Sequence, residues 1–316
     1  MAVPDEQLAR QLVVQLLGVQ PLEVRRFLTG AMHYVYEATF EGHPPVVVRI
    51  AASYGHAAMR GAAQLSRLLR PRGVPLPAIL AENLDGPFPC LILERLPGTD
   101  LGDVVGNLSK DQAEAVATAV VASQRIVAGL PVAAGKYGYA VSCETAPHTS
   151  WSQVLSSHFE RSRKHIAAAG IYDVEEVEPL FAVLADMDDE INSVAPTPFL
   201  HDTTTKNVIV TAEGKFSGIV DVDDLCFGDP RFAVALTSVA LLAWSLPLDY
   251  TAAWIRIAGF AEDRLFRVYL ALFLADFMSE RGMQFNRDKA DINPEYDQRL
   301  RQLYREAFAQ LSSPAQ

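Results

Sequence analysis

The sequence predicts an α+β fold in two lobes: a small lobe built on an antiparallel sheet, followed by a larger, mainly helical lobe. Between residues 23 and 96, short runs rich in β-branched and aromatic residues alternate with Gly and Pro, which is typical of strands and turns. From about residue 110, apolar residues recur at helical spacing, with one interruption. The turn "LPGTDL" separates the two regions. We therefore expect lobes of residues 1–96 and 97–316.

The small lobe is predicted to begin with an amphipathic helix over residues 5–18. Its apolar stripe consists of Leu8, Leu12, Val13, Leu16 and Leu17. The runs "VRRFLTG", "HYVYEATF" and "PPVVVRI" then predict three strands. A helix over 56–73, ending at a Pro/Gly boundary, precedes two further strands in "LPAILAEN" and "PCLILERL".

The large lobe is predicted to be helical around one hairpin. The helical pattern covers 110–129, 150–169, 174–193, 230–245, 250–260, 263–281 and 294–311. Two apolar pieces, "NVIV" and "FSGIV", are joined by the polar turn "TAEGK" and predict the hairpin. The apolar run 232–248 is short for a membrane span and carries polar residues, so we expect a buried helix, with Trp244 and Trp254 in the core.

Composition and charge narrow the possible partners and location. The net charge of −11 argues against a nucleic-acid partner, which would need a basic surface. The three cysteines show no close spacing, and no basic start precedes an apolar segment at the N-terminus. We therefore expect a cytoplasmic protein with neither a signal peptide nor a membrane partner. The sequence does not indicate an oligomeric state.

Three polar residues around the predicted hairpin have the spacing of a phosphoryl-transfer site. Asp202 and Asn207 are five residues apart in "HDTTTKN", and Asp221 follows Asp202 by nineteen. The hairpin would bring Asn207 and Asp221 to the same end, where both offer the hard oxygen ligands that Mg²⁺ prefers. Asp202 would then remain to accept a proton from an attacking hydroxyl.

With these motifs the chain resembles the aminoglycoside phosphotransferase and choline-kinase-like small-molecule kinases, which are relatives of protein kinases. The resemblance lies in "HDTTTKN", in "IVDVDDLCFGDP" and in the hinge-like "LILERLPGTDL", and it covers roughly residues 23–235. It implies a bilobal protein-kinase-like fold that uses ATP and Mg²⁺. It also implies Asp202 as the catalytic base, with Asn207 and Asp221 as metal ligands.

The resemblance assigns a nucleotide site to the small lobe. Arg49, in "VVVRI", occupies the place of the basic residue of the third strand that contacts phosphates. The loop "LTGAMHYVY" would cover the phosphates, with Gly30 allowing close approach. Backbone groups of Glu94 and Leu96 would face the adenine.

The sequence departs from the family pattern at three places. Leu200 stands where the family has His, and His201 fills a Gly position. Gly61 stands where the helix acid that pairs with the strand-three basic residue is expected, so either another group holds Arg49 or its arrangement is loose. The acid that usually follows the "GDP" motif is absent from "RFAVA".

Several acids have a less definite role. Asp223, Asp276 and Glu280 are candidate substrate contacts. For Asp276 the alternative is a structural ion pair with an arginine. Asp229 is expected to be a structural cap. A metal-dependent phosphohydrolase would need further histidines beside His201, and only His158 and His165 are plausible helix candidates. A phosphatase with an aspartate nucleophile in "DVDDL" would have that motif at the start of its domain.

We therefore expect an ATP- and Mg²⁺-dependent phosphotransferase. Its acceptor would be a hydroxyl of a small molecule, of the aminoglycoside, amino-alcohol or sugar type, because too few residues follow Asp221 for a peptide-docking segment. The alternative is a catalytically silent nucleotide- or ligand-binding protein on the same fold.

Overall fold

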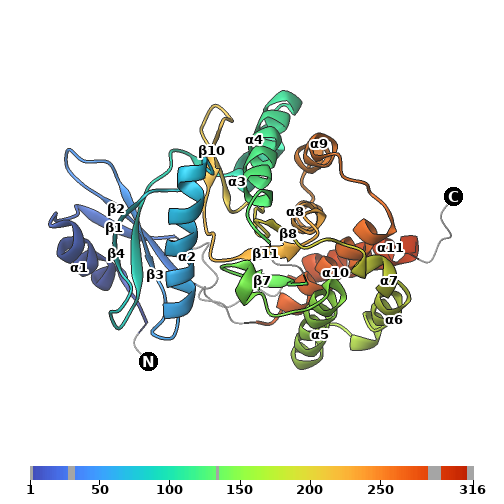
Figure 1. Cartoon of the computed structure of the whole chain (residues 1–316). Helices are drawn as coiled ribbons and strands as arrows, with labels where there is room; N and C mark the ends of the chain where they lie inside the picture. Colours follow the sequence, from blue (N-terminus) through green and yellow to red (C-terminus); the bar gives the residue numbers. More distant parts are fainter. Residues whose placement is uncertain (1–2, 28–32, 133–134, 284–292, 312–316) are drawn as a thin grey trace.

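A computed structural model describes residues 3–27, 33–132, 135–283 and 293–311, and it confirms the two-lobed α+β architecture (Figure 1). The small lobe contains a five-stranded antiparallel sheet in the order β1-β2-β3-β5-β4. Its strands are β1 (Glu23–Arg26), β2 (Tyr34–Thr39), β3 (Val46–Ile50), β4 (Ile79–Asn83) and β5 (Cys90–Glu94). All five expected strands form.

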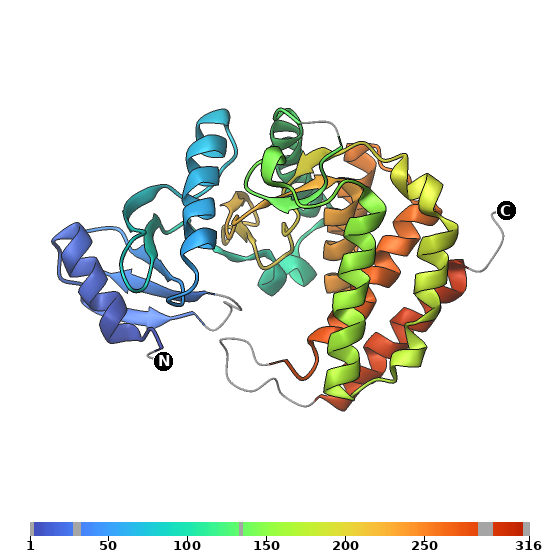
Figure 2. The same cartoon turned by 60° about the horizontal axis from the view of Figure 1, so that its bottom comes forward.

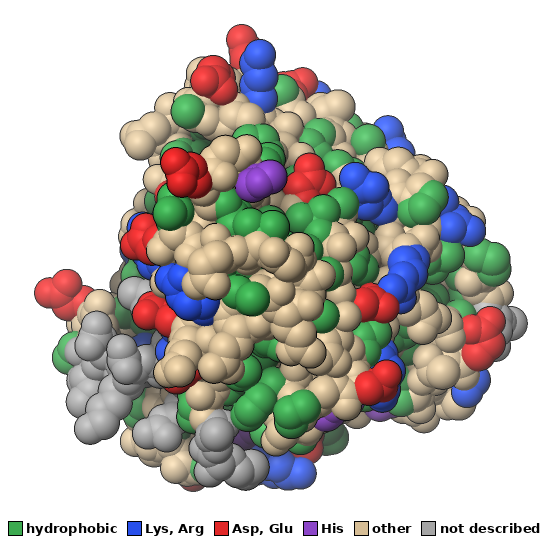
Figure 3. All heavy atoms as spheres, turned by 90° about the vertical axis from the view of Figure 1, so that its left-hand side faces the viewer, with side chains coloured by type: hydrophobic (Ala, Val, Ile, Leu, Met, Phe, Trp, Pro, Cys, Tyr) green, Lys and Arg blue, Asp and Glu red, His purple; other side chains and the backbone are tan. Residues whose placement is uncertain are grey.

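Helix α1 (Glu6–Leu17) covers one face of this sheet (Figure 1). Asp5 caps it by accepting a hydrogen bond from the Leu8 amide at 2.8 Å, and Gly18 ends it with a left-handed φ of 71°. The expected apolar stripe packs against the sheet: Leu12 and Val13 are buried, and the other three leucines are partly buried. Acidic and basic side chains are interspersed over the outer face of this lobe (Figure 3).

Helix α2 (His56–Leu69) lies between the sheet and the large lobe (Figure 1). Met59 and Ala63 pack toward the sheet, while Leu65 and Leu69 join a core shared with the large lobe. A Cβ atom at Gly61 would lie 2.7 Å from Val141 and 3.0 Å from the Asp223 carbonyl oxygen. Only glycine permits this approach of α2 to the large lobe.

The large lobe is mainly helical. Its helices are α3 (Leu101–Val104), α4 (Lys110–Ala128), α5 (Trp151–Ala169), α6 (Pro179–Asp186), α7 (Asp188–Asn192), α8 (Arg231–Ala243), α9 (Asp249–Ala258), α10 (Arg264–Glu280) and α11 (Pro294–Leu311). Short 3-10 turns lie at Arg70–Arg72, Val105–Asn107, Cys143–Thr145 and Val174–Glu176. Helix α10 is buried on nearly every side, and α5 and α11 run beside it (Figure 2).

Two small three-stranded sheets interrupt the helices. One has the order β10-β9-β6 and consists of β6 (Thr99–Asp100), β9 (Val208–Val210) and β10 (Phe216–Ile219). The other has the order β7-β11-β8 and consists of β7 (Gly138–Ala140), β8 (Thr197–Phe199) and β11 (Leu225–Gly228). The chain thus leaves the five-stranded sheet at Glu94 and pairs with the large lobe from Thr99. The boundary at 96/97 stays a prediction.

Two expectations about the large lobe are wrong. The helix expected over 174–193 forms as three pieces, because Pro179 begins α6 and the chain turns again at Met187. The apolar run beginning at residue 232 does form a buried helix, α8, and Trp254 is in the core. Trp244, however, is 58% exposed, because α8 ends at Ala243 and the side chain lies beyond the packed part. No helix in the described ranges is both long and apolar enough to cross a membrane.

Candidate active site

The β9–β10 hairpin brings two of the predicted site residues to one end. Val208 pairs with Ile219, and the Val220 amide donates to the carbonyl oxygen of Asn207 at 2.9 Å. Asn207 therefore immediately precedes β9, and Asp221 follows β10 after Val220. The backbone of Asp221 has a φ of 62°, a left-handed conformation that is uncommon for residues other than glycine and clusters at functional sites.

Hydrogen bonds within the loop connect Asp202 to Asn207. The Asn207 Nδ2 donates to the Asp202 carbonyl oxygen at 2.9 Å, and the Thr204 hydroxyl donates to Oδ1 of Asp202 at 2.9 Å. The Asn207 amide also donates to the Thr204 carbonyl oxygen. The threonines are buried and shape the loop that sets the Asp202–Asn207 distance.

Gln124 of α4 braces the predicted catalytic loop at Leu200, where the family pattern has His. Its Oε1 accepts from the Leu200 amide at 2.9 Å, and its Nε2 donates to the Leu200 carbonyl oxygen at 2.8 Å and to the Thr203 hydroxyl at 3.1 Å. All three bonds are buried. Sequence analysis missed this residue, although a glutamine within the apolar pattern of α4 is a signal for a buried polar contact.

His201 lies at the edge of the same loop. Its Nδ1 is 3.3 Å from Oδ1 of Asp224, and its ring meets Tyr139 edge-on with centroids 4.8 Å apart. Burial raises the pKa of Asp224 above its ordinary value, although His201 opposes this shift. The His201–Asp224 contact therefore links this loop to the residue that precedes β11.

Arg49 of β3 is buried, with 6% of its side chain exposed, and two acids of the large lobe bind it. Asp223 contacts both terminal nitrogens: Nη1–Oδ1 is 2.7 Å and Nη2–Oδ2 is 2.8 Å. Nη2 also contacts Oδ1 of Asp221. Burial works against the charged form of Arg49, but the two carboxylates outweigh it and raise the pKa.

Asp223 therefore pairs with Arg49 in place of the helix acid that the chain lacks at Gly61. It also bonds to Nε2 of His33 at 2.9 Å, and His33 was not singled out by sequence analysis. Burial alone would raise the pKa of Asp223, but the charge of Arg49 and the contact with His33 lower it to about 2. Its carboxylate faces Arg49, and Asp223 is not among the residues that line the adjacent cavity.

A cavity of about 1200 Å³ lies between the lobes and gathers most of the predicted residues. Its lining includes Asp202, Asn207, Asp221, Arg49, Glu94, Leu96, Asp276 and Glu280. On the small-lobe side the walls are apolar, with Val35, Val47 and Leu93. Gly30 lies outside the described residues.

The hinge residues are only partly available to a ligand. The Glu94 amide donates to the Ala78 carbonyl oxygen at 2.8 Å, and the Glu94 carboxylate accepts from the Ala78 amide at 3.0 Å. The Leu96 carbonyl oxygen accepts from the Arg95 guanidinium at 2.6 Å. The Glu94 N–H is thus already engaged, so an adenine contact there would have to use other hinge groups.

Asp276 of α10 lies in the cavity wall and is also ion-paired. It contacts Nη2 of Arg161 at 3.1 Å, the Ser162 hydroxyl at 2.9 Å and Nε2 of His158 at 3.3 Å. Burial would raise the pKa of Asp276, but His158 and Arg161 lower it well below its usual range. The ion pair with an arginine that was the alternative role for Asp276 is therefore present, and the arginine is Arg161.

The "GDP" motif has a structural role in the described part of the chain. Asp229 accepts hydrogen bonds from the Arg231 side chain and amide and, at 2.9 Å, from the Tyr269 hydroxyl. A Cβ atom at Gly228 would lie 2.2 Å from the Trp151 ring, which donates through its own N–H to Tyr269. This network joins β11 to α5 and α10 beneath the site.

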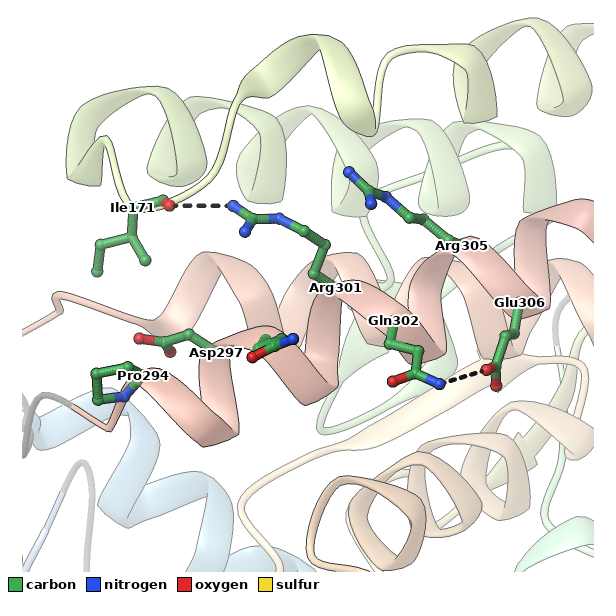
Figure 4. A pocket seen from close by; sticks show the side chains of 8 residues that line it. Ile171, Pro294, Asp297, Arg301, Gln302, Arg305 and Glu306 are labelled. Atoms are coloured by element: carbon green, nitrogen blue, oxygen red, sulfur yellow. Dashed lines mark hydrogen bonds between the residues drawn. The ribbon is translucent and has the colours of Figure 1, made fainter.

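A second hollow of about 710 Å³ lies on α11, away from these residues (Figure 4). Its arginines are already paired, because Arg301 and Arg305 both donate to the carboxylate of Glu176. Gln302 bonds to Glu306 in the same way. We assign it no ligand.

Comparison with known proteins places the chain in a family. The sequence model of the phosphotransferase enzyme family (APH) matches residues 23–272, most of the chain. The chain belongs to this family. A comparison of the phosphotransferase with curated protein sequences gives no match.

Solved structures share the fold of the phosphotransferase at low sequence identity. A thermostable mutant of the aminoglycoside phosphotransferase APH(4)-Ia, in its apo form, is 15% identical with a TM-score of 0.70 over 96% of this chain and 100% of that one. The GDP and kanamycin complex of APH(2")-IIia is 16% identical with a TM-score of 0.70, covering 97% and 99%. A putative fructosamine-3-kinase from Haemophilus somnus 129PT is 17% identical with a TM-score of 0.63, covering 94% and 96%. These likenesses confirm the protein-kinase-like fold.

Proposed function

We propose that this phosphotransferase moves the γ-phosphoryl group of ATP, with Mg²⁺, to a hydroxyl of a small molecule. One observation carries the proposal: Asp202, Asn207 and Asp221 line a single cavity between the lobes. Nucleotide and aminoglycoside complexes among its structural neighbours support the same reaction class. The three cysteines are buried, which suits a protein of the cytoplasm, where ATP is present.

The donor set at the hairpin end fits Mg²⁺. Asn207 is oriented through its Nδ2 bond to Asp202, which leaves the amide oxygen as its ligand atom, and Asp221 offers a carboxylate. Mg²⁺ would neutralise charge on the phosphates. Arg49 would add a fixed positive charge on the small-lobe side, held in place by Asp223.

Asp202 would act on the acceptor. The Thr204 hydroxyl occupies Oδ1, so Oδ2 is the oxygen that would meet the acceptor hydroxyl and receive its proton. Gln124 and the buried threonines hold this carboxylate in position before substrate binds. Such positioning, together with charge neutralisation, is the main source of rate in phosphoryl transfer.

The acceptor would be an aminoglycoside, amino-alcohol or sugar-type hydroxyl compound. The test is nucleotide turnover with Mg²⁺ across a panel of such compounds, comparing ATP with GTP. We expect turnover with at least one acceptor and its loss by a factor of about 10² or more in Asp202→Ala. Turnover that survives in Asp202→Ala would refute the role of this residue.

A catalytically silent binding protein is the second candidate, and one contact favours it. Arg49 bonds to Asp221, the residue proposed to bind the metal, so this carboxylate must exchange partners before it can act. A silent protein would bind nucleotide with unchanged affinity in the presence and absence of Mg²⁺ and would turn over none of the acceptors.

A further inference from the structure

The large-lobe side of the cavity has an aromatic wall. Trp244 is 58% exposed, whereas Trp151 and Trp254 are fully buried. Its ring lies 4.7 Å from that of Tyr296 at an interplanar angle of 33°, and Phe277 lines the same cavity. An exposed tryptophan in a cavity wall offers a large rigid surface on which the flat or apolar face of a ligand can stack.

This wall belongs to the cavity that contains Asp202. The volume of about 1200 Å³ exceeds that of a usual pocket for one drug-sized ligand, so it has room for a nucleotide and an acceptor together. Arg49 and the apolar residues of the small lobe line one part of it. Trp244 and Tyr296, from the ends of α8 and α11, line another part and are therefore placed to contact the acceptor.

Several carboxylates on this side already have partners within the chain. Asp276 is 16% exposed and bonded to Arg161, with His158 beside it. Asp224 lies against His201, and Glu280 is also engaged within the protein. Arg161 is half-exposed in the same wall and adds a positive charge there.

These pairs make the site unfavourable for a polycation. An ammonium group could reach Asp276 only by displacing the half-exposed Arg161 or by sharing its carboxylate, so it would lose an ion pair that the chain already makes. Arg161 would also repel any ammonium group nearby. A neutral ligand meets no such cost, a ligand with one ammonium group meets it only once, and both gain by stacking on Trp244.

We propose that the acceptor is a hydroxyl compound with a rigid apolar or aromatic face and at most one positive charge, seated with that face on Trp244 and Tyr296. This inference rests on the proposed phosphotransferase function. The acceptor oxygen forms a bond to the γ-phosphorus while the bond from that phosphorus to the β,γ-bridging oxygen breaks. ADP leaves with the electron pair of this bond, and the hydroxyl proton passes to Asp202.

Trp244 provides a test that does not depend on turnover. It is the exposed one of the three tryptophans in the chain, so a ligand that stacks on it changes the intrinsic fluorescence. The full chain is titrated with phenyl β-D-glucoside, with methyl β-D-glucoside, which lacks the aromatic face, and with kanamycin as the polycation. We expect phenyl glucoside to bind at least about fivefold more tightly than methyl glucoside, the size expected for one aromatic contact.

Variants locate the contact. In Trp244→Ala the preference for phenyl glucoside should disappear, measured by calorimetry, whereas Trp244→Phe should retain most of it. Because the side chain is exposed, both variants should unfold at the temperature of the unchanged chain, which is checked by thermal melting. Kanamycin binding more tightly than phenyl glucoside, or an aromatic preference that survives Trp244→Ala, would overturn the proposal.

The two proposals fail in different ways. Aromatic preference at Trp244 with no phosphoryl transfer to any acceptor would refute the proposed function while supporting the ligand class. Phosphoryl transfer confined to polycations would refute the ligand class while supporting the function. A lack of any aromatic preference also counts against the ligand class.

Discussion

Asp223 binds Arg49 through both ends of the guanidinium group, with Nη1–Oδ1 at 2.7 Å and Nη2–Oδ2 at 2.8 Å. The two residues are 174 positions apart and belong to different lobes. The acid that orients the strand-three arginine therefore comes from the segment after Asp221, not from α2. Because Gly61 lets α2 approach the Asp223 backbone, a helix acid at that position would have no room.

Asp223→Asn should loosen Arg49 and destabilise the protein. The change keeps the shape but leaves a buried positive charge with weaker compensation. Removing one partner of a fully buried pair costs ~3–5 kcal/mol, and because Asp223 is 30% exposed we expect about 2 kcal/mol. Denaturant unfolding measures this loss, and calorimetry should show weaker nucleotide binding.

The matched control is Asp85→Asn, which removes the exposed acid of the Arg60–Asp85 pair. No measurable change in stability is expected there. Asp223→Glu should recover part of the nucleotide affinity that Asp223→Asn loses. Equal effects of the Asp223 and Asp85 changes would show that Asp223 does not hold Arg49.

Gln124→Leu should damage the catalytic loop although Gln124 touches no substrate. The substitution keeps the volume but removes three buried hydrogen bonds and leaves the Leu200 amide without its partner. An unsatisfied buried group costs ~1–3 kcal/mol, so unfolding free energy should fall by about 2 kcal/mol. Acceptor turnover should fall with little change in nucleotide affinity.

Gln302→Leu is the control, because it breaks an exposed Gln302–Glu306 hydrogen bond on α11. It should leave both stability and turnover unchanged. If Gln124→Leu lowered nucleotide affinity and turnover in parallel, its effect would be general and not specific to the loop.

Gly61→Ala should separate α2 from the large lobe. The added methyl would lie 2.7 Å from Val141 and 3.0 Å from the backbone at Asp223, and such overpacking costs ~1–3 kcal/mol. Chemical denaturation of the variant measures the cost. Gly129→Ala, where the nearest atom is 3.4 Å away, is the matched control and should be nearly neutral. A neutral Gly61→Ala would mean that the lobes adjust freely at this contact.

The fold class and the positions of Asp202, Asn207 and Asp221 could be predicted from sequence because they depend on local spacing. The β-branched and aromatic runs of β2 and β3 and the β9–β10 hairpin are short-range features. The strands β6, β7, β8 and β11 were missed because each is short and pairs only with strands distant in the sequence, without a hairpin turn to reveal it.

The partners of these residues could not be predicted in the same way. Asp223 meets Arg49, and Gln124 meets Leu200, across 174 and 76 residues of chain, so tertiary packing alone brings them together. The lack of an acid at Gly61 left two possibilities open, another partner for Arg49 or a loose arrangement, and it did not identify Asp223. The prediction that Trp244 is buried was wrong because an apolar run does not show at which residue the helix ends, and α8 ends at Ala243.

Asp100, at the start of the large lobe, should make stability depend on pH. Burial first, and then repulsion by Asp103, raise the pKa of Asp100 to about 6 in the folded chain, against 3.8 as its ordinary value. The protonated form is therefore favoured by folding. This contribution is present below about pH 4 and is lost as pH rises through about 6.

Asp100→Asn should remove that pH dependence by keeping the side chain neutral. At pH 7 the variant should be more stable than the unchanged chain by about 1 kcal/mol, a value reduced for the partial exposure of this cavity-lining side chain. At pH 4 the two should be equal. Unfolding curves at both pH values measure the difference, with Glu41→Gln in the exposed β2–β3 loop as control. A stability gain of the same size at pH 4 and pH 7 would show that ionisation of Asp100 is not its cause.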